Sequence, residues 1–158
     1  MSDLGSRGER IDECGPLLKQ MLHEIAGVTL YKIIPEEKDI ISATLKDWAD
    51  NAKLDLIVTS GGTGLSSRDV TPEAMQSVIE KNIPGISEAM RVQTMIKSPF
   101  AMLSRSMAGS RGKCLIINLP GSPKGVKECL EVVLPVIPHA IEILNDKTAH
   151  THPRPDKD

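Results

Sequence analysis

The chain has 158 residues, the size of one domain with a substantial hydrophobic core. An apolar fraction of 40% and a charged fraction of 25% are typical of water-soluble globular proteins. A net charge of −2 excludes the strongly basic surface that nucleic acids and anionic membranes attract. No apolar run is long enough to span a bilayer and no signal peptide is present, so we expect a cytoplasmic protein that does not insert into membranes. The three cysteines are not closely spaced, so we expect no zinc site. The net charge leads us to expect no binding of nucleic acid.

The first part of the chain predicts two helices and two strands. After a polar loop, Pro16 begins a helix whose apolar residues recur at helical spacing. The β-branched run at 28–34 predicts a strand, and Pro35 begins the next helix. The apolar run at 54–59 predicts a second, buried strand.

The middle of the chain predicts helices over about 72–82 and 84–93. Residues 96–112 are compatible with either helix or strand, followed by a turn between two glycines. The apolar run at 113–119 predicts a third buried strand, which leads into a second tight loop.

The last part of the chain predicts a long helix over about 126–144, which Pro135 and Pro138 should kink or divide. Thr, His, Pro and Lys dominate the residues that follow. We therefore assign residues 1–146 to one domain and expect residues 147–158 to be a flexible tail or the start of a linker.

The alternation of strands and amphipathic helices predicts an α/β fold. We expect three layers, with a mostly parallel sheet covered by helices on both faces. No strand precedes the loop before the first helix, although a doubly wound fold supplies one there. The pattern therefore predicts that the first strand is missing.

A glycine-rich stretch follows the strand at 54–59, where open α/β sheets bind ligands. Glycines let the backbone come close to a phosphate, whose oxygens can accept hydrogen bonds from backbone N–H groups. Neither the Walker A lysine nor the Rossmann spacing is present, which disfavours a typical kinase or dehydrogenase site. A simple tight turn is the structural alternative. The binding residues predicted here are Ser60, Gly61, Gly62, Thr63 and Gly64.

Two acidic residues are candidate magnesium ligands. Asp69 follows Arg68 at the end of the glycine stretch, and Glu36 follows the strand predicted at 28–34. Parallel strands would bring both carboxylates to one sheet edge, and carboxylate oxygens suit Mg²⁺. In the structural alternative, Asp69 pairs with Arg68 or begins the next helix, and Glu36 is an acid at a helix start.

A second candidate anion-binding loop follows the strand at 113–119. It supplies N–H and hydroxyl donors at the start of a helix. Lys124, just beyond it, is either a phosphate partner or a surface charge. The binding residues predicted in this loop are Asn118, Pro120, Gly121 and Ser122.

Several short motifs follow one another along the chain: 59–64, 68–74, Pro84-Gly85, 102–105, Gly112, 118–121 and 127–129. In this order they resemble the molybdopterin adenylyltransferase family, and within it especially the gephyrin-type G domain. The resemblance covers nearly everything from Ser2 to about Asn145.

The resemblance implies an enzyme of molybdenum cofactor biosynthesis. Such a nucleotidyltransferase takes ATP, Mg²⁺ and molybdopterin, transfers AMP to the molybdopterin phosphate and releases pyrophosphate. It also implies a homotrimer, with a molybdate-insertion domain in the same or another chain. Asp69 takes the place of the family's catalytic acid and Glu36 that of a second family aspartate, so both are implied to be catalytic and metal-binding.

The amino-terminal residues are part of the same resemblance. Ser2 and Asp3 match the family's Ser-Asp and are implied to bind a substrate, and Cys14 replaces a family serine. Relatives carry an apolar strand before Ser-Asp, where this chain has only Met1. The alternative function is a non-catalytic molybdopterin-binding or trimeric scaffold module of a gephyrin-like protein.

Overall fold

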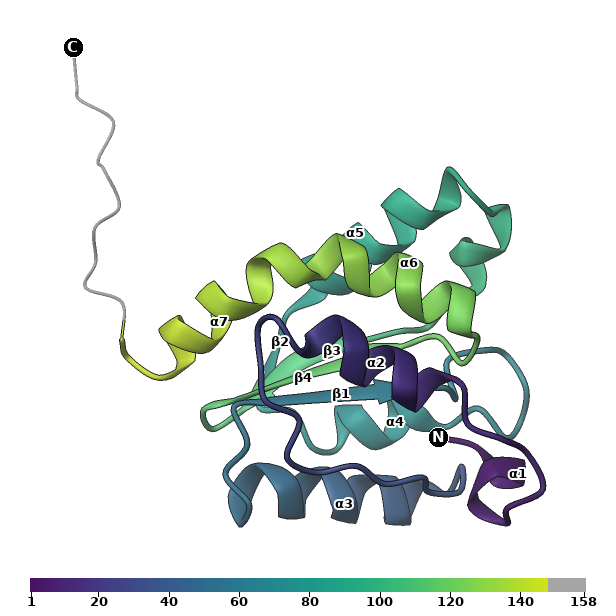
Figure 1. The fold of residues 1–158 in the computed structure, drawn as a ribbon, viewed down its shortest axis with the longest axis horizontal. Helices are drawn as coiled ribbons and strands as arrows, with labels where there is room; N and C mark the ends of the chain where they lie inside the picture. Colours follow the sequence, from purple (N-terminus) through teal and green to yellow (C-terminus); the bar gives the residue numbers. More distant parts are fainter. Residues whose placement is uncertain (148–158) are drawn as a thin grey trace.

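A four-stranded sheet forms the middle layer of the fold in the computed structural model, which describes residues 1–147 (Figure 1). The strand order is β1-β4-β3-β2. The strands are β1 (Leu56–Ser60), β2 (Lys81–Asn82), β3 (Ala108–Arg111) and β4 (Cys114–Leu119).

The sheet is mixed, so the expectation of a mostly parallel sheet is wrong. Only β1 and β4 pair in parallel, whereas β3 pairs antiparallel with both β4 and β2. The reason is the short connection between β3 and β4, which turns at Gly112 with φ 52°. Two strands joined by so tight a turn can only lie antiparallel.

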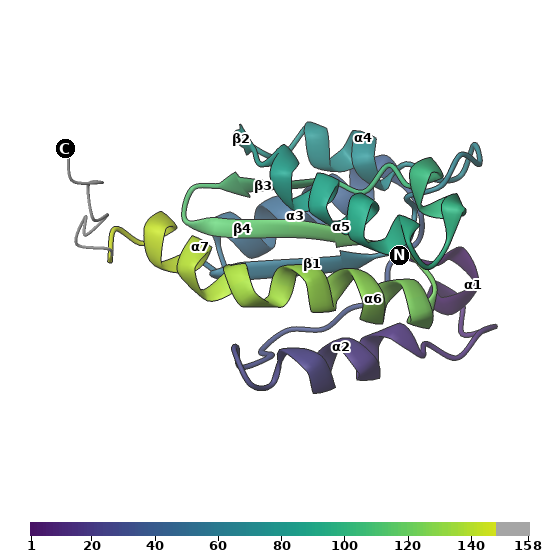
Figure 2. The ribbon, with the colours of Figure 1, turned by 90° about the horizontal axis from the view of Figure 1, so that it is seen from above.

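Helices cover both faces of the sheet, as the sequence predicts (Figures 1 and 2). One face packs against α2 (Cys14–Leu22), α5 (Pro84–Met95), α6 (Pro123–Val133) and α7 (Ile137–Leu144). The other face packs against α3 (Lys38–Asp50) and α4 (Thr71–Gln76). The remaining elements are α1 (Asp3–Ser6) and the two 3₁₀ helices η1 (Pro99–Leu103) and η2 (Leu134–Val136).

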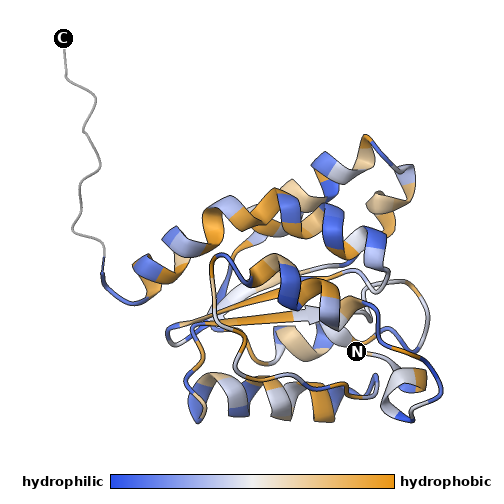
Figure 3. Cartoon of the chain, viewed as in Figure 1, coloured by the Kyte–Doolittle hydropathy of each residue, from blue (hydrophilic) through white to orange (hydrophobic). Residues whose placement is uncertain are grey.

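The core is divided between the two faces by the alternation of side chains along β4. Leu115 and Ile117 pack with the α6 side, whereas Ile116 packs with the α3 side, and all three are fully buried. Each such side chain stabilises the fold by about 1.5–3 kcal/mol through burial. Figure 3 shows the apolar residues concentrated on the strands and on the helix faces that meet them.

The strand predicted at 28–34 does not form. Among residues 1–147 this segment has no ladder partner, and Val28, Leu30 and Tyr31 are each more than 40% exposed. It runs beside β1 without pairing to it (Figure 2). A β-branched run becomes a strand only when its backbone forms a ladder with a neighbouring strand. Here the Ile34 carbonyl accepts the Ser2 N–H instead.

Three other element boundaries differ from the expectations. The helix predicted at 72–82 ends at Gln76, and residues 81–82 pair with β3 instead. The helix predicted from Pro35 begins only at Lys38. The ambiguous region 96–112 contains η1 followed by β3, so the turn expected between Gly109 and Gly112 is mostly strand.

The prolines of the last helix divide it, as predicted: η2 separates α6 from α7. The tail predicted at 147–158 lies outside the described residues except for Lys147. Within residues 1–147, no helix combines the length and the apolarity needed to cross a bilayer.

The amino-terminal residues lie against the carboxyl end of β1 rather than in a strand of their own. The Met1 ammonium group donates a hydrogen bond to the Ser60 carbonyl, and the Ser2 N–H donates one to the Ile34 carbonyl at 3.0 Å. These two contacts place the start of the chain at the sheet edge that holds the candidate site.

Candidate functional site

Two loops meet at the carboxyl ends of the parallel strands β1 and β4. The Gly61 N–H donates to the Leu119 carbonyl at 3.0 Å, and the Ser60 hydroxyl donates to the Pro120 carbonyl at 2.8 Å. The buried Asn118 amide donates to the Thr59 hydroxyl at 3.0 Å. The structure therefore brings both glycine-containing loops predicted from the sequence to one place.

The glycine loop is held in a backbone conformation that favours glycine. Gly61 and Gly62 have φ values of 101° and 65°. A Cβ on Gly62 would lie 2.2 Å from the Thr71 hydroxyl oxygen, and the Gly62 carbonyl accepts a hydrogen bond from the Thr71 N–H at 3.2 Å. The first turn of α4 therefore packs directly onto the loop.

Asp69 and Glu36 face the same site. The Asp69 carboxylate accepts a hydrogen bond from the Ser66 N–H at 2.9 Å, which fixes it across the loop from Gly64. Burial raises the pKa of Glu36, and repulsion from the Asp69 carboxylate raises it further. Two carboxylates that repel one another form a site that a divalent cation would stabilise.

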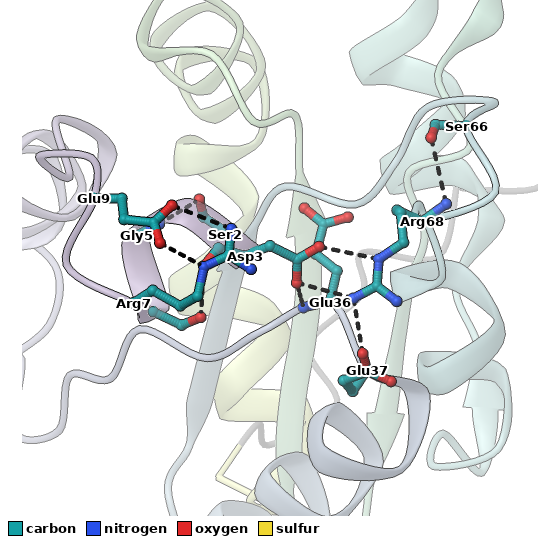
Figure 4. Close-up of polar contacts among 10 residues, drawn as sticks. Ser2, Asp3, Gly5, Arg7, Glu9, Glu36, Glu37, Ser66 and Arg68 are labelled. Carbon is teal, nitrogen blue, oxygen red and sulfur yellow. Dashed lines mark hydrogen bonds and ion pairs between the residues drawn. The ribbon is translucent and has the colours of Figure 1, made fainter.

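Asp3 joins the amino terminus to both of these acidic segments (Figure 4). Its carboxylate accepts the Glu36 N–H at 2.9 Å and two Arg68 N–H groups at 3.0 Å each. The same guanidinium donates to Glu37 at 2.8 Å. The hydrogen bond from Arg68 holds the pKa of Asp3 below its usual range. Arg68 therefore pairs with Asp3 and Glu37, not with Asp69, which removes the first of the two structural alternatives for Asp69. The second, an acid at a helix start, still applies because α4 begins at Thr71.

Cys14 begins helix α2 beside the second loop. Its thiol donates to the Gly121 carbonyl at 3.6 Å, while its N–H donates to the Asp12 carboxylate at 3.1 Å. Asp12 also accepts the Gly15 N–H at 2.9 Å and the Tyr31 hydroxyl. Burial, with the Asp12 hydrogen bond, raises the pKa of Tyr31 to about 12, so this phenol stays a donor at neutral pH.

Two cavities meet at the glycine loop, and Thr63 and Gly64 line both of them. The first, of about 350 Å³, extends from the loop past Glu36 and Asp69 to β1 and the unpaired segment 30–34. The second, of about 340 Å³, lies between α5, η1 and the second loop and includes Lys124. Most predicted site residues line one or other cavity.

Sequence reasoning assigned no role to Arg105, although its side chain donates to the Gly64 carbonyl and its backbone N–H to the Thr63 carbonyl. Its guanidinium bonds to the carbonyls of Gly64 and Asp69 and to the carboxylate of Glu73. Its place at the end of the 102–105 motif of the family resemblance is the sequence signal for it. Two of the three guanidinium partners are backbone carbonyls, and these cannot be predicted from residue types.

Comparison with known proteins is consistent with this geometry. Residues 1–139 match the family described as a probable molybdopterin binding domain. The chain belongs to this family. It is 43% identical over 146 residues to the molybdopterin adenylyltransferase of Helicobacter pylori, a match that covers 90% of this chain and 83% of the relative.

Larger relatives and solved structures agree with the family assignment. The chain is 44% identical to gephyrin of Dictyostelium discoideum over 163 residues, covering 96% of this chain but 23% of gephyrin. The crystal structure of the molybdopterin biosynthesis enzyme MoaB from Thermus thermophilus superposes with a TM-score of 0.85 at 48% identity, covering 92% of each chain. The Mog protein from Mycobacterium ulcerans has a TM-score of 0.84 at 39% identity, covering 90% of this chain and 93% of its own.

Proposed function

We propose that this protein is a molybdopterin adenylyltransferase of molybdenum cofactor biosynthesis. In this reaction an oxygen of the molybdopterin phosphate attacks the α-phosphorus of ATP. The bond to the β-phosphate breaks, AMP is transferred and pyrophosphate leaves. The observation that carries the proposal is the pair of cavities that share Thr63 and Gly64. Two cavities joined at a phosphate-binding type of loop suit two anionic substrates that must meet.

The residues present fit a magnesium ion held mainly by substrate. Among residues 1–147, no three His, Cys, Asp or Glu side chains are grouped to hold a metal. Asp69 and Glu36 would supply two carboxylates, and Mg²⁺ in nucleotide sites commonly takes one or two carboxylates together with phosphate oxygens and water. When bound, the ion would neutralise charge that develops on the leaving pyrophosphate.

The chain's own groups would mainly position substrates and balance charge. Backbone N–H groups of the glycine loop can hold phosphate oxygens, and Lys124 at the second cavity can compensate negative charge. The attacking phosphate is already ionised at neutral pH, so no strong general base is required. Asp69 therefore serves as a metal ligand or positioning group rather than as a base.

A turnover assay tests the proposal. Purified protein with molybdopterin, ATP and Mg²⁺ is expected to release pyrophosphate and form adenylylated molybdopterin. Asp69→Asn should lose turnover by about 100-fold or more while still binding molybdopterin, since it removes charge at the reacting phosphates. The matched control is Asp47→Asn, on the exposed side of α3, which should retain full turnover.

Tight molybdopterin binding by the wild type without any ATP-dependent product would refute the enzyme proposal. It would favour the alternative of a non-catalytic binding or scaffold module. The same assay in the absence of Mg²⁺, with chelator present, tests the metal requirement.

A homotrimer and a molybdate-insertion domain in the same or another chain remain part of the proposal, as does a cytoplasmic location. A trimer is supported by large apolar side chains on α5, η1 and the turn between them, all more than half exposed: Val92, Ile96, Phe100, Met102 and Leu103. Sedimentation should give three times the chain mass, and Phe100→Glu should shift it toward the monomer. A wild-type monomer at micromolar concentration would contradict this.

A further inference from the structure

Arg105 connects the two ends of the segment that carries Asp69. Its Nε donates to the Gly64 carbonyl at 2.8 Å, and its Nη2 donates to the Asp69 carbonyl at 2.6 Å. Its own N–H donates to the Thr63 carbonyl at 2.9 Å. One residue therefore fixes the glycine loop and Asp69 relative to each other.

The third guanidinium nitrogen of Arg105 forms an ion pair with Glu73. Nη1 donates to the Glu73 carboxylate, which lies in the first turn of α4 just after the loop. The contact ties the loop to α4, whose residues Ala74 and Met75 are fully buried in the core. The Arg105 side chain is only 33% exposed, so these hydrogen bonds are partly shielded from water.

The backbone that presents Arg105 is itself attached to the fold. The Asn118 N–H donates to the Met107 carbonyl at 2.9 Å, next to the start of β3. Arg91 of α5 donates to the carbonyls of Ser104 and Ser106, at 3.4 and 3.1 Å. The backbone of Arg105 is therefore held by the sheet and by α5, and its side chain in turn holds the loop in place.

We infer that Arg105 is a positioning residue for adenylyl transfer, holding the Gly64 backbone and the Asp69 segment at their working separation. The inference rests on the proposed function. Arg105 acts through the loop and touches neither phosphate nor metal in this role. Only a planar guanidinium has donors spread widely enough to reach three acceptors on different segments, whereas a lysine ammonium is a single point.

The decisive variant is Arg105→Lys, which keeps the charge and most of the aliphatic stem. We expect kcat to fall by about 10-fold to 100-fold, since displacement of a reacting group by about 1 Å can have such an effect. The KM for molybdopterin should change by less than about twofold, because the substrate contacts themselves remain. The matched control is Arg111→Lys, which loses guanidinium hydrogen bonds to the Asp50 carboxylate and the Val78 carbonyl away from both cavities, and should retain turnover.

Amide hydrogen exchange gives a second readout that does not depend on turnover. In Arg105→Lys the N–H groups of Ser66 and Asp69, which bond within the loop, should exchange about tenfold faster or more, whereas those of β4 should be unchanged. Unchanged exchange in the loop would overturn the inference, as would wild-type kcat in the lysine variant. If wild-type protein shows no turnover, the proposed function fails, and the exchange experiment still decides the role of Arg105.

Discussion

Replacing Gly62 by alanine should destabilise the protein because two separate costs arise at this position. The backbone has φ 65°, and a residue with a Cβ pays about 1–2 kcal/mol there. The new Cβ would also lie 2.2 Å from the Thr71 hydroxyl oxygen and 3.0 Å from its Cβ. Thr71 is fully buried, so relief requires a backbone shift, typically about 1–3 kcal/mol. The expected loss in the free energy of unfolding is about 2–5 kcal/mol.

Urea unfolding at equilibrium measures this loss, and a double-mutant cycle separates its two parts. The Thr71 hydroxyl has no hydrogen-bond partner within the described part of the chain, so Thr71→Ala removes the 2.2 Å contact without breaking a hydrogen bond. Gly62→Ala should therefore be less harmful in the Thr71→Ala background, by about 1 kcal/mol or more. Gly27→Ala, where no atom lies within 4 Å of the new Cβ, is the control and should change stability by less than about 0.5 kcal/mol. Additive effects of the two substitutions would refute the steric reasoning.

Two further substitutions test the acidic side of the site. Gly64→Ala places a Cβ 2.9 Å from the Asp69 carboxylate. Because this side chain can move aside, stability should change by less than about 1 kcal/mol, but its displacement should lower turnover by about tenfold or more. Wild-type turnover in this variant would show that the position of the carboxylate does not matter. Glu36→Gln tests the pKa of Glu36, which burial and Asp69 raise above its unfolded value. The folded state thus disfavours the ionised carboxylate, and wild-type stability should fall relative to the glutamine variant as pH rises from about 4 to 7 without Mg²⁺. A relative gain of wild-type stability over this range, in urea unfolding at both pH values, would contradict the assignment.

The parts of the fold that were predictable are those fixed by burial. The runs at 54–59 and 113–119 are mostly apolar because they pair with each other and helices cover both faces of the sheet, and they form β1 and β4. The run at 28–34 has a similar composition and runs beside β1, but it forms no backbone ladder with that strand and stays unpaired. Composition reports what a segment can do, whereas pairing depends on a partner elsewhere in the chain. The two-residue strand at 81–82 is too short for any periodic pattern to reveal.

Some residues of the candidate site could be predicted from the sequence, whereas the contacts of others could not. Glycines, Asn118 and the acids can be found from the sequence because their chemistry is local and they follow strand ends. The contacts of Arg68 and Arg105 could not be found, since their partners lie 31 to 65 residues away for Arg68 and 32 to 41 residues away for Arg105. Both arginines carry the same charge, yet one binds carboxylates and the other mainly carbonyls. Residue type does not distinguish these roles.

The two candidate metal ligands, Asp69 and Glu36, are held in place by different contacts. This difference matters because Glu36 is one methylene longer than the aspartate that the family resemblance implies at this position. The Asp69 carboxylate is fixed within its own loop by the Ser66 N–H. For Glu36 it is the backbone N–H that is fixed, by Asp3, and within residues 1–147 its carboxylate has no hydrogen-bond donor. A side chain anchored only at its backbone can absorb one additional methylene by a change of rotamer. Glutamate at this position is therefore compatible with a shared metal, provided that Asp3 keeps the backbone of residue 36 in place.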